Sequence, residues 1–113
     1  MSRDDYRKQL LDLYRGLPHR AARRPSLYDR RLVDQLFERG VPLNVLETAF
    51  LLAIARRTGR DPQAPPLPPI RSLAYFLPLI DEALLLADDP GYLAYLRSKV
   101  DQSVQISTGR GDR

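Results

Sequence analysis

Residues 43–55 read LNVLETAFLLAIA and form the longest apolar pattern in the chain, between the turn at 40–42 and the polar residues 56–59. Beyond the second position, Glu47 and Thr48 are its only polar residues. The segment is too short to cross a bilayer, which needs about 20 apolar residues. A helix that is apolar on nearly every side is buried by other helices. The pattern therefore predicts a central helix in a small all-α domain.

Two amphipathic helices are predicted before this segment. Apolar residues at three- and four-residue steps indicate a first helix over Asp4–Arg15, which ends at Gly16. Ser26 and Asp29 have the spacing of a capping box at the start of a second helix, and Gly40 suits the position after its end. The residues expected on the buried faces are Tyr6, Leu10, Leu13, Tyr14 and Leu17 in the first helix and Tyr28, Leu32, Val33, Leu36 and Phe37 in the second.

A proline-rich segment follows the central helix. Pro42 is expected at the first position of that helix, and Gly59 is expected after its last. Residues 60–70 contain five prolines, which predict an extended polyproline II segment, called here the strap. Ser72 can cap a fourth helix, in which Pro78 leaves two arrangements open. Either a short turn over residues 73–77 precedes a helix that starts at Pro78, or one helix is kinked there.

The last predicted helix begins at Asp89-Pro90 and runs to Gln102, with Tyr92, Leu93, Leu96 and Val100 facing inward. The remaining residues, 103–113, have no apolar periodicity and are expected to be disordered. The sequence therefore predicts one domain over residues 1–102. Its fold class is all-α, a compact orthogonal bundle of four to five helices with the strap between helices 3 and 4.

Composition excludes several kinds of chemistry. The 113 residues contain no cysteine and one histidine, His19, so neither a thiolate or histidine metal site nor a Ser-His-Asp triad is expected. No glycine-rich phosphate loop or nucleophile elbow is present. We therefore expect a non-enzymatic protein without a cofactor or metal. No signal peptide is visible and no segment is long enough to span a membrane, so a cytoplasmic location is expected.

The positive charge is concentrated near the N-terminus. Residues 1–31 carry nine basic and four acidic residues, whereas residues 32–113 carry nine basic and ten acidic residues. Such asymmetry is typical of proteins that bind polyanions. Guanidinium groups bind phosphates with two hydrogen bonds, and a tyrosine can stack on a base or donate to a phosphate. The candidate nucleic-acid-binding residues are Arg20, Arg23, Arg24, Tyr28, Arg30 and Arg31.

Two alternatives compete with this interpretation. The same arginines can form an ordinary solvated surface, with Arg30 paired to Asp34 and Arg31 to Gln35 at i,i+4 spacing. The junction over residues 36–46 has the order of a helix-turn-helix, but the helix after it offers mainly leucine, alanine, phenylalanine and isoleucine. A recognition helix must present polar side chains to the major groove. Ordinary packing of two helices is therefore the favoured interpretation of that junction.

Three short segments, Gly40-Val-Pro-Leu, Pro68-Pro-Ile-Arg-Ser-Leu-Ala-Tyr-Phe76 and Asp89-Pro-Gly-Tyr-Leu-Ala-Tyr-Leu96, are similar to segments of small bacterial helical proteins and of replication-protein domains of mobile elements. This resemblance implies mobile-DNA biology and supplies no catalytic residue. The first functional hypothesis is an accessory protein that binds DNA or RNA through backbone phosphates. The second is a protein–protein adaptor or self-associating module, which docks through the fourth helix or the Tyr92–Tyr95 face.

Overall fold

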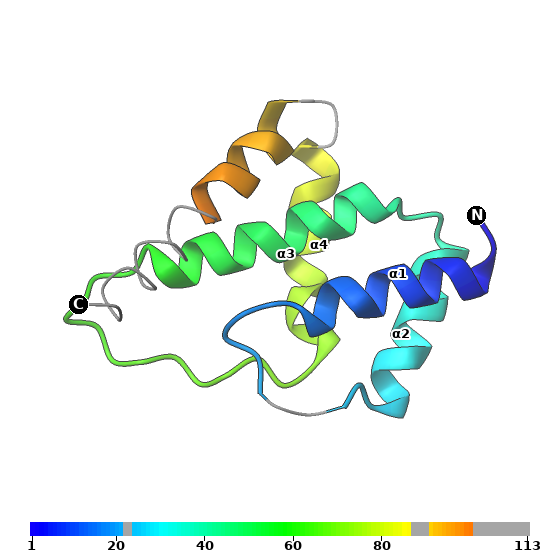
Figure 1. The fold of residues 1–113 in the computed structure, drawn as a ribbon, viewed down its shortest axis with the longest axis horizontal. Coiled ribbons are helices and arrows are strands. Elements are labelled where there is room, and N and C mark those ends of the chain that lie inside the picture. The colour runs from blue at the N-terminus through cyan, green and yellow to red at the C-terminus, as the bar shows by residue number, and fades with distance from the viewer. Residues whose placement is uncertain (22–23, 87–90, 101–113) are drawn as a thin grey trace.

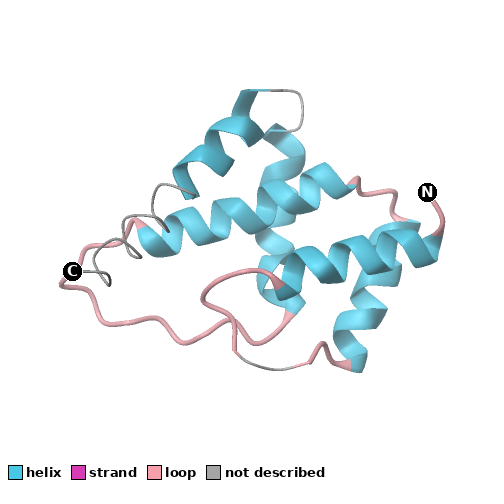
Figure 2. Ribbon diagram, viewed as in Figure 1, coloured by secondary structure: helices cyan, strands magenta, loops and turns pink. Residues whose placement is uncertain are grey.

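The computed structural model describes residues 1–21, 24–86 and 91–100, and these ranges contain helices and no β-strand (Figure 1). The helices are α1 (Arg3–Arg15), α2 (Leu27–Glu38), α3 (Leu43–Thr58), the short 3-10 helix η1 (Leu73–Phe76) and α4 (Leu77–Leu86), and residues 91–100 are also helical. Figure 2 shows the long loops that separate α1 from α2 and α3 from η1. The predicted all-α bundle is confirmed.

Helix α3 is the centre of the core, as its composition predicts. It packs against α1, α4 and η1, and eight of its sixteen residues are buried. Phe50 of α3 contacts Phe76 at the end of η1 with 4.7 Å between ring centroids, and Tyr14 of α1 lies 6.4 Å from Phe50. Burying each such apolar side chain stabilises the fold by about 1.5–3 kcal/mol. The hydrophobic effect therefore accounts for the position of this helix.

Helix α2 begins and ends at the residues that the sequence indicates, and α1 ends as expected but begins one residue earlier, at Arg3, with Ser2 as its N-cap. Ser26 and Asp29 form the complete capping box, and Gly40 adopts φ 74°, a left-handed conformation that glycine reaches at little cost. The hydroxyl of Tyr6 on α1 donates to the backbone oxygen of Val41, at 2.7 Å, just after α2. This buried hydrogen bond joins the start of α1 to the connection between α2 and α3.

The expected buried face of α2 is wrong at its first member. Val33 and Leu36 are buried and Leu32 and Phe37 are half-buried, but Tyr28 is 80% exposed. In the first turn of α2 the inward position is taken by Asp29, which is 4% exposed, and Tyr28 beside it faces solvent. On α1, Tyr6, Leu10 and Tyr14 are buried as expected, with Leu13 and Leu17 half-buried; Leu11, which the pattern omits, is also buried.

The strap is not extended over its whole predicted length, because residues 62–64 form a turn in which the amide of Ala64 donates to the oxygen of Asp61 at 2.9 Å, whereas residues 65–70 contain no turn. It is bonded to neighbours on two sides. Its last residue forms an isolated parallel bridge with the loop after α1, in which Ile70 donates to the oxygen of His19 and accepts from the amide of Ala21, both at 2.8 Å. On the other side, Arg57 donates to the oxygen of Pro68 at 2.8 Å and Arg60 to that of Pro65 at 3.0 Å. The two longest loops of the described chain are thus held together.

The segment around Pro78 follows the first of its two open arrangements. The 3-10 helix η1 comes first, and α4 starts one residue before Pro78, where a proline does not interrupt helical hydrogen bonds. Ser72 precedes η1 but its side chain makes no capping bond. The amide of Leu73 is instead satisfied by the buried carboxylate of Asp29 on α2, at 2.9 Å.

Residues 91–100 form a helix that lies over α3, to which Arg97 is joined by a 2.7 Å hydrogen bond to Glu47 (Figure 1). Leu96 and Val100 are buried as predicted, and Tyr92 and Leu93 are half-buried. The predicted cap at Asp89-Pro90, the end at Gln102 and the tail over 103–113 fall outside the described residues. Pro42 is the N-cap of α3 rather than its first residue. In the described ranges no helix has the length and apolarity to cross a membrane.

Candidate nucleic-acid interface

The exposed face at the start of α2 carries both basic and apolar side chains. Leu27 is 63% exposed and Tyr28 is 80% exposed, and Arg30 and Arg31 are exposed beside them. Side chains three and four positions apart are neighbours on a helix, so Leu27 adjoins both arginines and Tyr28 adjoins Arg31. Arg24 is exposed on the approach to the helix. This face therefore presents three guanidinium groups around two apolar surfaces.

Unlike six other arginines of the described ranges, these three have no carboxylate partner. Arg24, Arg30 and Arg31 make no ion pair with any residue that the structure describes. By contrast, each of the following arginines contacts a carboxylate on a different helix: Arg3 with Glu38, Arg7 with Asp34, Arg39 with Asp81, Arg56 with Glu82, and Arg97 with Glu47. The exposed face of α2 thus has uncompensated positive charge.

The local pairing expected for a solvated surface is not formed. Asp34 accepts from Arg7 of α1 at 2.8 and 3.2 Å and not from Arg30, and no described hydrogen bond joins Arg31 to Gln35. The hydrogen bond to Asp34, followed by the attraction of its charge, raises the pKa of Arg7. A tertiary contact has therefore replaced the i,i+4 pair and has left Arg30 without an acid.

The loop arginines occupy different positions from those on α2. Arg20 is half-buried, and its guanidinium lies over the ring of Tyr14, 4.6 Å from the centroid. Its backbone belongs to the bridge with Ile70. Arg20 therefore contributes to packing of the loop, and less of it reaches solvent than of Arg24. Arg23 lies outside the described residues.

The N-terminus of α2 is already occupied by its own capping groups. The hydroxyl of Ser26 accepts from the amide of Asp29 at 3.1 Å, and the Asp29 carboxylate accepts from the amide of Ser26 at 2.9 Å. That carboxylate is 4% exposed and adds a negative charge at the helix start. The backbone is thus poorly suited to hold a phosphate here, and binding would rely on the arginine side chains.

The sequence interpretation missed one basic residue near this face. Arg71 is exposed and forms no ion pair within the described chain. The hydrogen bond between Leu73 and Asp29 brings residues 71–73 to the first turn of α2. Only the position of Arg71 directly after the strap could have drawn attention to it, because the contact spans 44 residues of sequence.

The helix-turn-helix alternative does not fit the structure. Helix α3, which would have to enter the major groove, lies at the centre of the core with eight of its sixteen residues buried. No group of three or more histidine, cysteine or acidic side chains that could hold a metal ion exists among the described residues. Comparison with family models, with curated proteins and with solved structures finds no match for this chain.

Proposed function

We propose that this protein binds the backbone phosphates of a nucleic acid, DNA or RNA, through the exposed arginines at the start of α2. Arg24, Arg30 and Arg31 would contact phosphates with Tyr28 beside them, and Arg20 and Arg23 are further candidates from the sequence. The observation that carries the proposal is the absence of any carboxylate partner for Arg24, Arg30 and Arg31 in the described structure. A guanidinium without an acid is free to bind phosphate bidentately. The proposed activity is binding and needs no cofactor.

The apolar residues of the same face support a nucleic-acid partner. Base–aromatic stacking is worth about 1–3 kcal/mol per base, and Tyr28 exposes most of its ring next to Arg31. Phosphate contacts by arginine fix the position of the strand without reading its sequence. The face is therefore suited to non-specific contact with phosphates and one or two exposed bases. Such binding would serve an accessory role and would be strongly dependent on salt.

The test replaces Arg24, Arg30 and Arg31 together with glutamine and measures binding of labelled duplex DNA, single-stranded DNA and RNA by fluorescence anisotropy. Each phosphate contact contributes about 0.9 to the salt slope on duplex DNA, so losing three should reduce the slope by about 2.7. The stability of the fold should change little, because exposed charges are usually worth under about 0.5 kcal/mol.

A matched control removes the same charge elsewhere, at Lys8, Arg15 and Arg39. All three are exposed, and the contacts of Arg15 with Asp12 and of Arg39 with Asp81 are long, at 3.9 and 3.8 Å. Arg57 would be a poor control, because it bonds to the strap. Equal loss of affinity in both triple variants, or no binding by the wild type at low salt, would refute the proposal.

A second candidate function, a protein-binding adaptor, is favoured by exposed apolar residues on the other side of the core. Leu85 at the end of α4 is 84% exposed, and Tyr95 on the helix of residues 91–100 is 56% exposed. Exposed apolar patches mark interaction sites in soluble proteins. Sedimentation velocity at high salt tests self-association. A dimer that Leu85→Glu dissociates, together with no affinity for nucleic acid, would favour this function over the first.

A further inference from the structure

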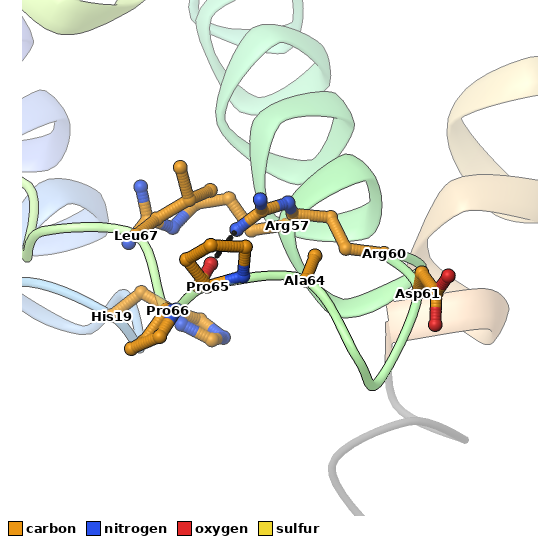
Figure 3. Close-up of a pocket in the computed structure, with 8 residues that line it drawn as sticks. All are labelled: His19, Arg57, Arg60, Asp61, Ala64, Pro65, Pro66 and Leu67. Carbon is orange, nitrogen blue, oxygen red and sulfur yellow. Dashed lines mark hydrogen bonds between the residues drawn. The ribbon is translucent and has the colours of Figure 1, made fainter.

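A second positively charged region, independent of the α2 face, lies where the strap passes the end of α3. A cavity of about 270 Å³, called here the strap pocket, opens between the strap, the C-terminal end of α3 and the loop after α1 (Figure 3). Its polar lining residues are His19, Arg57, Arg60 and Asp61. The prolines of the strap and Ala64 form the remaining wall together with Leu67.

The two arginines of the strap pocket have hydrogen-bonding capacity that the described protein does not use. Arg57 donates to the oxygen of Pro68 at 2.8 Å and to the hydroxyl of Tyr75 at 3.3 Å, and Arg60 donates to the oxygen of Pro65 at 3.0 Å. Neither forms an ion pair with a described carboxylate, and the Nε of Arg57 is buried without a partner. Two full positive charges therefore lie side by side against neutral acceptors only.

The other titratable groups of the pocket do not neutralise this charge. Burial, and then the positive charge of Arg57, lower the pKa of His19, so its imidazole is neutral near pH 7 and offers one N–H donor. Asp61 accepts from the amide of Gln63 at 2.9 Å, and Figure 3 shows its carboxylate pointing away from both arginines. The pocket as a whole is therefore positive and rich in donors.

A second hollow continues the pocket on the far side of the arginines. It has a volume of about 260 Å³, shares Arg57, Arg60 and Leu67 with the strap pocket, and extends to Tyr75 and Leu79. Tyr75 is 42% exposed, and its ring lies 5.8 Å from the guanidinium carbon of Arg57. The rest of this hollow is lined by Ala53 and by Arg56, whose charge is paired with Glu82, so its unpaired lining beyond the two arginines is apolar and aromatic.

We propose that the strap pocket binds a small organic phosphate monoester, with the phosphate between His19, Arg57 and Arg60 and an apolar or aromatic body against Tyr75 and Leu79. The donors come from two segments, His19 from the loop after α1 and both arginines from the end of α3 and just after it, and two guanidinium groups suit the double charge of a phosphate monoester better than the single charge of a carboxylate. Charge-assisted hydrogen bonds of this kind are the strong ones. The site does not depend on the α2 face and would exist whether or not the protein binds nucleic acid.

The experiment uses phenyl phosphate as the probe and the single histidine of the chain as the reporter. Because His19 is the only histidine, its imidazole proton resonances are unambiguous in a one-dimensional NMR spectrum. Saturable shifts of these resonances, with a rise in the pKa of His19 caused by the bound dianion, are expected. Arg60→Gln should weaken the affinity about tenfold or more, because it removes a charged donor. Arg39→Gln, on the connection between α2 and α3, should leave the affinity unchanged.

Several outcomes would overturn this assignment. Sodium chloride at the same ionic strength is one control. If it shifts the His19 resonances as much as phenyl phosphate does, the shifts are caused by screening of charge and not by binding at a site. Benzoate that binds as tightly as phenyl phosphate would exclude a phosphate site, and inorganic phosphate that binds as tightly would exclude the apolar subsite. If Arg60→Gln unfolds, Arg60→Lys retains the charge but not the planar donor and should still weaken binding. The α2 triple variant should bind phenyl phosphate as the wild type does, which separates this site from the proposed interface.

Discussion

Replacing Asp29 with alanine should destabilise the protein more than any other single change of a charged residue in the described chain. The Asp29 carboxylate is 4% exposed and accepts two backbone hydrogen bonds, from Ser26 and from Leu73, both at 2.9 Å. The first closes the capping box of α2. The second attaches α2 to η1 across 44 residues of sequence. One side chain thus holds both the start of a helix and a tertiary contact.

The expected loss is about 3 kcal/mol. A hydrogen bond to a charged group contributes about 1.5–3 kcal/mol, and the alanine variant leaves the amide of the buried Leu73 without an acceptor. Part of this loss is offset because a buried carboxylate no longer has to be desolvated. Since domains of this kind are stable by about 5–15 kcal/mol, the variant should still fold but with a much reduced margin.

Urea denaturation followed by circular dichroism measures this loss as a lower midpoint with an unchanged m-value. Asp34→Ala is the control on the same helix. Its partner Arg7 is more than a third exposed, so the pair should be worth about 1 kcal/mol or less. Hydrogen exchange gives a local check, because the amide of Leu73 should lose its protection in Asp29→Ala only. Two variants of equal stability, or an amide of Leu73 that stays protected, would refute the reasoning.

Three further predictions concern backbone conformation, a buried hydroxyl and pH. Gly40→Ala should lower the free energy of unfolding by about 1 kcal/mol, because φ is 74° and alanine is strained in this conformation. An added Cβ meets no atom within 4 Å, so steric contact adds nothing to this cost. An unchanged urea midpoint would contradict the assigned conformation. Tyr6→Phe should lower the free energy of unfolding by about 1 kcal/mol, because the backbone oxygen of Val41 loses its donor, and a variant as stable as the wild type would show that the bond contributes nothing. Burial raises the pKa of Tyr6, so in an ultraviolet titration of the wild type this tyrosine should ionise at higher pH than the exposed tyrosines. The pKa of His19 is lowered in the folded protein from its ordinary value of 6.5, so the unfolded chain binds the proton more readily. The free energy of unfolding should therefore be unaffected by protonation of His19 above pH 6.5 and should fall as the pH drops from there through the folded pKa. His19→Gly should reduce this fall, and a variant with the same pH profile as the wild type would exclude the effect.

Much of the fold could be predicted because its determinants are local. The caps at Ser26 and Gly40, the prolines of the strap and the uninterrupted apolar character of α3 each act over a few residues. The same local rule fails for Tyr28, which has the right spacing for the buried face but is 80% exposed, because Asp29 takes the inward position in that turn. The periodicity of apolar residues does not show where a polar side chain faces the core.

The candidate site was less predictable because its character depends on distant partners. Whether Arg30 is neutralised depends on Asp34, and the i,i+4 rule does not include the competing Arg7 on another helix. Arg57 and Arg60 are unremarkable in sequence, and only the folded chain brings His19 to them and leaves them without an acid. A cluster of arginines in the sequence can therefore suggest an interface, but the ion pairs of the folded protein decide which of them are available.

Two strap carbonyls are held near the end of α3, that of Pro68 by Arg57 in its last turn and that of Pro65 by Arg60, two residues after the helix. The two carbonyls are three residues apart, and three residues make one full turn of polyproline II, the conformation that the prolines predict, which would turn both carbonyls to the same side. Adding one residue between them would rotate the second carbonyl by about 120° and break the match. Loops of this length ordinarily accept insertions at small cost. Here an insertion between Pro65 and Pro68 would move one of the two carbonyls away from Arg57 or Arg60, so this part of the strap should not share that tolerance.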